Sequence, residues 1–330
     1  MNHTRRGSRA RPAGRLLAAT VTLLALLAVE VAEAHDAIPP GTADLSPSHR
    51  GSVSLGYQFV KVDGFALQGG TTAFVGKLES HSALLEVDWL LGERLELQVG
   101  LPYIKRQWVG GRMHNPTPCQ PGQVSGCLTV PHPEAEFIDD GLFHGNWQDW
   151  SLGLTYHVEA GSFQLEPLVR LYLPSHDYSH FGQAATGPNR LRLELGADLA
   201  KQLAFSNFYY RVGYSYELWE KTLGIDASKN KARVELGYFL SPRWAVRALA
   251  FGQYGKGRYD IPLPPVGSRT DETWYQHDRF LRHNHAHAGA GAAFTFWEVY
   301  SVSLDVITMV WGQSVLRTDY AGTISLSRRF

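Results

Sequence analysis

The stretch Leu191-Arg192-Leu193-Glu194-Leu195-Gly196-Ala197-Asp198-Leu199 alternates without a break between apolar residues at odd numbers and Arg, Glu, Gly or Asp at even numbers. Successive side chains of a β-strand point to opposite faces, so this period of two describes a strand with one apolar and one polar face. The same alternation runs through 207–218 and 231–240. From residue 51 onward, the chain therefore reads as β-strands, and we find no helical spacing in it.

Twelve such segments follow one another along the chain: 51–62, 81–91, 94–107, 148–158, 163–173, 190–200, 207–218, 231–240, 243–254, 284–296, 299–310 and 319–330. Their connections alternate between short turns, such as 92–93 and 241–242, and longer loops, such as 108–147 and 255–283. A meander with short turns at one end and long loops at the other is typical of outer-membrane barrels. The sequence predicts an all-β, transmembrane, antiparallel up-and-down barrel of about 12 strands, with short periplasmic turns and long extracellular loops.

Composition agrees with two opposite faces on each strand. A strand in lipid satisfies its backbone groups only when it is paired on both sides, which requires a closed barrel. Lys+Arg and Asp+Glu both total 31, which argues against nucleic acid as a partner. Aromatic residues gather near strand ends, where amphipathic rings favour the headgroup level: Trp89, Tyr103, Trp108, Trp147, Trp150, Trp219, Trp244 and Trp311. The alternative is a secreted β-sandwich or propeller, but we find no propeller repeat of about 40 to 50 residues.

The amino terminus predicts export. Arginines precede an apolar run at 16–29, and Ala32-Glu33-Ala34 has the small-x-small pattern of a cleavage site. We expect residues 1–34 to be a signal peptide, 35–50 to be a periplasmic segment that forms a partial plug, and 51–330 to be the barrel of a Gram-negative outer-membrane protein. The last strand ends at Phe330, which resembles the carboxy-terminal signal read by the outer-membrane insertion machinery.

Two cysteines lie in one turn-rich stretch, at Cys119 and Cys127. Disulfides persist outside the cytosol, so the pair predicts a bridge that staples the loop 108–147. A metal or redox pair is the alternative, although the chain offers no further Cys.

Several segments resemble the outer-membrane family named for the MetA-pathway of phenol degradation. The resemblance rests on Val99-Gly100-Leu101-Pro102-Tyr103, Asp149-Trp150-Ser151-Leu152-Gly153-Leu154-Thr155-Tyr156 and Leu171-Tyr172-Leu173-Pro174-Ser175. It spans roughly residues 50 to 330. It implies a barrel and a role in the uptake of hydrophobic or aromatic compounds, and it supplies no site residues.

Charged side chains on the polar faces are the candidate lining of the lumen. By the alternation they are Glu86, Asp88, Glu96, Glu166, Arg170, Arg192, Glu194, Asp198, Arg211, Glu217, Arg233, Glu235, Arg247 and Asp305. Such residues either pair across neighbouring strands and fill a narrow barrel, or line a solute path, and the two roles are compatible.

Histidines form a second group of candidates. Nine of the 14 fall in or beside predicted loops: His114, His132, His144, His176, His180, His277, His283, His285 and His287. On a strand, His283, His285 and His287 would share one face, and with His176 or His180 they would suit Zn or Cu. The alternative is that these imidazoles are solvated residues of the barrel mouth.

These patterns predict a channel or transporter in the outer membrane for passive passage of a small solute, with the loops 108–147 and 255–283 gating its mouth. The solute would be hydrophobic or aromatic if the family resemblance extends to function. A metal-binding protein with a His-rich mouth is the second hypothesis. A hydrolase is the third, because Ser175, His176, Asp177, Ser179 and His180 have the residue types of a rim site. No nucleophile elbow is present, so we expect no enzyme.

Overall fold

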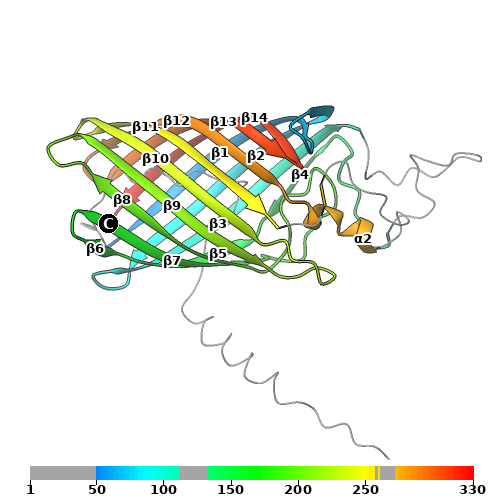
Figure 1. Cartoon of the computed structure of the whole chain (residues 1–330), viewed down its shortest axis with the longest axis horizontal. Helices are drawn as coiled ribbons and strands as arrows, with labels where there is room; N and C mark the ends of the chain where they lie inside the picture. Colours follow the sequence, from blue (N-terminus) through cyan, green and yellow to red (C-terminus); the bar gives the residue numbers. More distant parts are fainter. Residues whose placement is uncertain (1–49, 112–113, 115–131, 257–258, 261–271) are drawn as a thin grey trace, which may run out of the picture.

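The computed structural model describes residues 50–111, 114, 132–256, 259–260 and 272–330. The alternating segments form twelve wall strands of one closed antiparallel barrel, which confirms the predicted fold class (Figure 1). The β elements are β1 (Gly51–Ala66), β2 (Thr72–Leu90), β3 (Leu95–Gly110), β4 (Phe143–Trp147), β5 (Trp150–Tyr156), β6 (Val158–Ala160), β7 (Phe163–Leu173), β8 (Arg192–Gln202), β9 (Phe208–Trp219), β10 (Lys229–Ser241), β11 (Trp244–Gly255), β12 (Asn284–Phe296), β13 (Tyr300–Gln313) and β14 (Val315–Arg329).

One wall strand is interrupted. β4 and β5 both pair with β3, while β5 and β6 both pair with β7, so the three short elements follow one another along a single strand position. The interruption between β4 and β5 lies at Gln148 and Asp149, which are both buried.

The barrel closes between its first and last strands. β1 pairs with β2 on one side and with β14 on the other, so that Val53 faces both Val87 and Arg328. At the carboxy terminus, the Gly51 carbonyl accepts from the Phe330 N–H, and the Phe330 carbonyl accepts from the Arg50 N–H. Closure removes the unpaired strand edges that a bilayer does not tolerate.

Alternation sorts the wall into two faces. On β14, Thr323 and Ser325 are buried towards the interior, whereas Ile324 and Leu326 are 49% and 47% exposed on the outside. Similar exposed apolar side chains lie on every side of the barrel, a surface that matches the acyl chains of a bilayer.

Two of the aromatic residues expected at the headgroup level lie elsewhere. Trp108 is 1% exposed, because it shares the inward parity of Ile104 and Arg106 on β3. The Trp219 ring also belongs to the interior, where it contacts the guanidinium of Arg192 and the ammonium of Lys229. Trp89 follows the prediction at the turn end, with its ring 5.5 Å from that of Phe330.

Two predicted loops are shorter than expected. The loop predicted at 63–80, between the first two strands, comprises only residues 67–71, because β1 and β2 continue pairing up to Ala66 and Thr72. The loop predicted at 311–318, between the last two strands, is reduced to Ser314, whose positive φ of 56° lets β13 turn directly into β14. β1, β2, β13 and β14 therefore extend further at the loop end than predicted.

The loop between β11 and β12 carries two short helical elements, α2 (Glu272–Tyr275) and η1 (His277–Phe280). They lie at the loop end of the barrel, opposite the carboxy terminus (Figure 1). Among the described residues, no helix has the length and apolar character to span a membrane.

Several predictions fall on residues outside those described. They concern the signal peptide 1–34, the plug 35–50 apart from Arg50, and the disulfide between Cys119 and Cys127. All three stay predictions.

Candidate functional site

The fourteen charged candidates lie on wall strands, and most of them take part in ion pairs inside the barrel. Arg192 is deeply buried, at 1% exposure. Its two terminal nitrogens lie 3.3 Å from a carboxylate oxygen of Asp149 and 3.3 Å from one of Glu217. The Tyr172 ring covers the guanidinium at 4.2 Å. Three neighbouring wall positions thus converge on one cation.

Two further arginines each donate two hydrogen bonds to one carboxylate. Arg247 Nε and Nη2 lie 2.8 and 2.5 Å from the two oxygens of Asp305. Arg233 donates to both oxygens of Asp198, with its Nε at 2.9 Å. Glu235 lies 3.9 Å from Arg247 and extends that pair. The two-nitrogen geometry fixes each guanidinium in orientation as well as position.

The remaining candidates complete this network or lie near its turn end. Arg211 lies 3.5 Å from Glu166 and 3.9 Å from Asp198. Ser215 donates to Glu194, and Arg170 donates to Gln98 at 2.8 Å. Asp88 accepts from Ser52 at 2.8 Å. Glu86 shares the inward parity of Asp88 on β2. We call the inward-facing charged side chains of β7 to β11, together with Asp149 and Asp305, the charged wall. Its role along a solute path stays a prediction.

Four members of the network were not among the candidates. Lys231 contacts Glu217, and its inward parity is that of Arg233 on β10. Tyr172 donates to Glu194 at 2.6 Å and continues the inward row of Arg170. The alternation places both side chains on the inward face. Tyr172 was not among the charged candidates because tyrosine is uncharged. Asp149 and His157 flank β5 and share the inward parity of Ser151 and Thr155, so the alternation of 148–158 also places them on the inward face. His157 bridges Glu96 and Glu166 at 3.2 and 3.3 Å.

Beside the charged wall, part of the interior is apolar, chiefly on β1, β2, β3, β13 and β14. A buried cluster joins side chains of the wall to side chains of two loops: Val60, Val62, Phe65, Leu78, Trp108, Leu249, Ile307 and Ala321 from the wall, and Ile138, Ala184 and Ala185 from the loops. We call it the apolar collar. Arg106 anchors one of the loops to the wall, because its guanidinium donates to the Ala185 carbonyl and lies 3.4 Å from Ser80 Oγ.

A buried carboxylate holds the two loops against each other. Asp139 precedes β4, and its oxygens accept from the backbone N–H groups of Ala184 at 2.9 Å and Gln183 at 3.0 Å. Asp139 also lies 2.8 Å from His114 Nδ1. The loops that reach the collar are therefore fixed by buried hydrogen bonds, a class of interaction that is costly to break.

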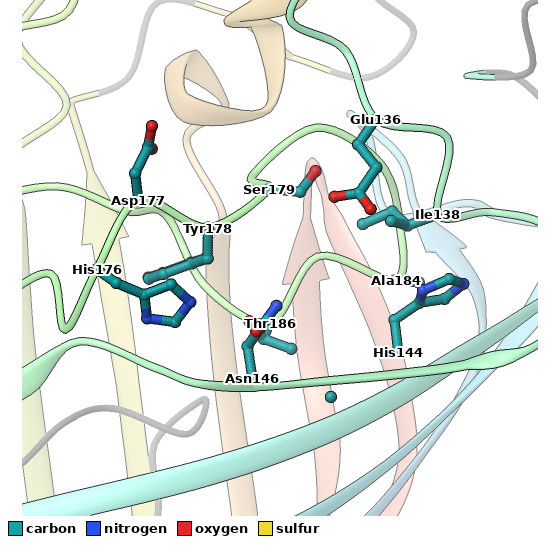
Figure 2. A pocket seen from close by; sticks show the side chains of 11 residues that line it. Glu136, Ile138, His144, Asn146, His176, Asp177, Tyr178, Ser179, Ala184 and Thr186 are labelled. Atoms are coloured by element: carbon teal, nitrogen blue, oxygen red, sulfur yellow. The ribbon is translucent and has the colours of Figure 1, made fainter.

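Beside the collar lies a recess of about 340 Å³ with a mostly polar lining. Figure 2 shows His144 and Asn146 from β4 facing it, with Glu136 and Ile138 from the preceding loop and His176 to Ser179 from the loop after β7. His144 Nε2 lies 2.9 Å from Asp140, and this bond lowers the pKa of Asp140 below its usual value. The recess offers hydrogen-bonding groups at the entrance of the barrel.

Among the described residues, the five histidines predicted to bind metal do not form a group of three whose ligand atoms converge. His283 precedes β12 with a positive φ of 50°, so it leaves the row of His285 and His287, whose rings are 4.8 Å apart. His176 is exposed and lies 2.9 Å from Ser175 Oγ, while His180 packs against the Tyr275 ring. Burial, followed by the charge of Arg279, lowers the pKa of His180 to about 3.

Within the described part of the chain, the one His/Asp/Glu group of three or more whose ligand atoms converge is a different one: His114, His277 and Asp278. Burial lowers the pKa of His277. The residue types suggested for a hydrolase do not form a triad in the structure, because Asp177 accepts from Asn189 Nδ2 at 2.9 Å rather than orienting His176.

Comparison with known proteins shows the fold. No family model and no curated protein matches the chain, so the resemblance to the MetA-pathway family is not confirmed. The chain is similar in structure to a COG4313 outer membrane channel from Pseudomonas putida F1, with 12% identity, a TM-score of 0.64, and 89% of this chain and 100% of that chain covered.

Two further similarities are looser. The toluene transporter TodX from Pseudomonas putida shares 12% identity at a TM-score of 0.42, over 88% of this chain and 92% of that one. The NanC porin shares 7% identity at a TM-score of 0.44, over 85% of this chain and 100% of that one.

Proposed function

We propose that the chain is a channel of the bacterial outer membrane for the passive entry of a small solute with an apolar or aromatic body. The observation that carries the proposal is the make-up of the interior: an apolar collar, mostly on β1 to β3, β13 and β14, lies beside a charged wall on β7 to β11 that begins at the loop end with Arg192. The apolar outer surface, the closed barrel and the similarity to an outer membrane channel support the location. The long loops would face the cell exterior and both termini the periplasm.

The collar favours apolar solutes over hydrated ions. A small ion that passes between side chains such as Leu78 and Ile307 must shed its hydration, and buried charge without a partner is costly. An apolar or aromatic solute meets no such cost and gains contact with the same side chains. Beside the collar, the charged wall would supply polar groups for the substituents of the solute. The polar recess beside the collar would receive the solute first.

Flux measurements test this function. The mature chain would be inserted into liposomes whose outer leaflet is lipopolysaccharide, because that leaflet slows the free permeation of apolar compounds. Entry of benzyl alcohol would be compared with entry of erythritol, a polyol of similar size. We expect protein-dependent entry of the aromatic compound to exceed that of the polyol by about tenfold, which corresponds to about 1.4 kcal/mol.

Two results would contradict the proposal. Equal entry of both compounds would indicate a general diffusion pore, and entry of neither would indicate that the barrel does not conduct solutes. A Phe74→Ser variant serves as control, because Phe74 is 69% exposed on the outside of the barrel and touches neither the collar nor the charged wall.

A further inference from the structure

Three potential metal ligands from two loops meet at the mouth of the barrel. His114 follows β3, and His277 and Asp278 belong to η1 between β11 and β12. His114 Nε2 lies 3.3 Å from His277 Nε2 and 3.6 Å from Asp278 Oδ2, while His277 Nε2 lies 3.2 Å from Asp278 Oδ1. The two ring centres are 5.2 Å apart, so the two Nε2 atoms face each other across the space between the rings.

Hydrogen bonds at the far side of each ring determine which nitrogen carries the proton. His277 Nδ1 lies 2.5 Å from the Trp274 carbonyl oxygen, which accepts only, so Nδ1 is the donor. His114 Nδ1 lies 2.8 Å from the Asp139 carboxylate, which also accepts. In both neutral imidazoles, Nε2 therefore presents a lone pair. Two imidazole nitrogens and a carboxylate directed at one point are a donor set that a divalent transition-metal ion binds.

The spacing suits a tetrahedral ion. With metal–nitrogen bonds of about 2.0 to 2.1 Å, two ligand atoms of a tetrahedron lie about 3.3 Å apart. The separations of 3.3 Å between the two Nε2 atoms and of 3.2 Å from His277 Nε2 to Asp278 Oδ1 agree with this edge. His114 Nε2 lies 3.6 Å from the other Asp278 oxygen, and one ligand atom from each residue can be chosen so that all three lie within 4.8 Å of one another. Ligating imidazoles commonly donate their second nitrogen to a carboxylate or a carbonyl. Asp139 and Trp274 supply those two partners.

We propose that His114, His277 and Asp278 bind one divalent transition-metal ion of the Zn²⁺ type, which cross-links the β3–β4 loop to the β11–β12 loop over the barrel mouth. Two imidazoles and one carboxylate leave the fourth position of the ion to water. The site is linked to the loop contacts at the mouth, because Asp139, the partner of His114, also accepts hydrogen bonds from Gln183 and Ala184 beside the collar. Metal binding here does not depend on which solute the barrel carries.

A metal titration of the full mature chain in detergent micelles tests the site. The protein is treated with a chelator, returned to buffer, and titrated with ZnCl₂ against a chromophoric competitor. We expect one ion per chain, and a loss of affinity of more than about 100-fold in His277→Ala, since removal of a ligand exceeds the 10- to 100-fold effect of removing a ligand's outer partner. Asp139→Asn should fall within that smaller range.

Matched variants separate this site from the alternatives. His176→Ala removes an exposed histidine near the same mouth and should bind as the wild type does. A wild-type chain that takes up no Zn²⁺ would overturn the proposal. Binding that survives His277→Ala and disappears in a His283→Ala, His285→Ala, His287→Ala triple variant would assign the metal to β12 instead.

Spectroscopy on the wild type keeps the test independent of how the variants fold. The Zn²⁺-loaded chain would be examined by X-ray absorption at the zinc edge. Two imidazoles with oxygen ligands support the site, whereas three imidazoles or a thiolate sulfur would overturn it.

Discussion

The charged wall and the apolar collar both lie on the inward face of one barrel but are built in different ways. In the wall, each partner comes from a strand one or two positions away, as with Arg192 of β8 and Glu217 of β9. In the collar, wall side chains such as Leu78 meet loop residues such as Ile138 and Ala184. Strand register alone creates the wall, whereas the collar also requires loops to fold back into the barrel.

The difference predicts how each region fails. Buried ion pairs are weak net contributors to stability, but a buried charge that loses its partner is strongly destabilising. An apolar cluster loses stability in proportion to the cavity that a truncation leaves. The wall should therefore be sensitive to single changes of charge, and the collar to changes of volume.

Arg192→Met should have the largest effect on stability. It leaves the carboxylates of Asp149 and Glu217, both at 0% side-chain exposure, without this cation. We expect a loss of about 3 to 5 kcal/mol in the free energy of unfolding, measured by urea titration in detergent with tryptophan fluorescence. Arg243→Met, at an exposed turn, is the control. A loss below about 1 kcal/mol would show that the wall tolerates unpaired charge.

Leu78→Ala tests the collar. Leu78 is 2% exposed and packs inside the cluster, so truncation should cost about 3 kcal/mol. The same cavity should raise the ion current through single channels in a planar bilayer, because it opens space in the collar along the proposed solute path. Leu55→Ala on the outer face, where Leu55 is 59% exposed, should change neither quantity. An unchanged current together with lost stability would separate the collar from the conduction path.

Alternation along single strands predicted most of the fold. β7 and β12 have the predicted bounds, and the barrel closes with the predicted number of strands. The signal is local, since every second residue of one segment decides it. It did not reach the extra length of β1 and β2, because the polar residues at 68–71 interrupt the pattern and Lys77 and Glu79 are exposed on the outer face.

The three proposed metal ligands and the collar could not be predicted in this way. His114 and His277 are 163 residues apart and belong to segments without periodicity, so nothing in the spacing connects them. The strand spacing predicted for His283, His285 and His287 holds only for His285 and His287, since His283 lies outside β12. Contacts between loops depend on how the barrel brings distant segments together.

Acidification provides the next test of the loops. His180 is buried, and its pKa in the folded chain is about 3, below its ordinary 6.5, so the contribution of neutral His180 is complete above pH 6.5 and is lost as pH falls from 6.5 towards 3. Arg279 and Arg190 oppose its protonation, and Asp278 favours it. Between pH 7 and pH 5, the loops should lose about 2 kcal/mol. Hydrogen exchange of the chelated protein would measure this loss, and His180→Gln should remove it.

The smallest expected effect on stability is also the sharpest test of why the wall is charged. In Arg247→Met with Asp305→Leu, both partners of a two-nitrogen pair are replaced together, and Glu235 keeps the hydrogen bond from Tyr209 at 2.7 Å. Exchanging a buried pair for apolar residues of similar volume is often neutral or stabilising, so the double variant should remain within about 1 kcal/mol of the wild type. The single variant Asp305→Leu should lose about 3 kcal/mol or more, because Arg247 is then buried without this carboxylate. If the double variant is stable but its ion selectivity in planar bilayers changes, the charges serve the solute path. If the double variant is as unstable as the single one, the pair is required by the fold itself, and the contrast between wall and collar is one of chemistry rather than of function.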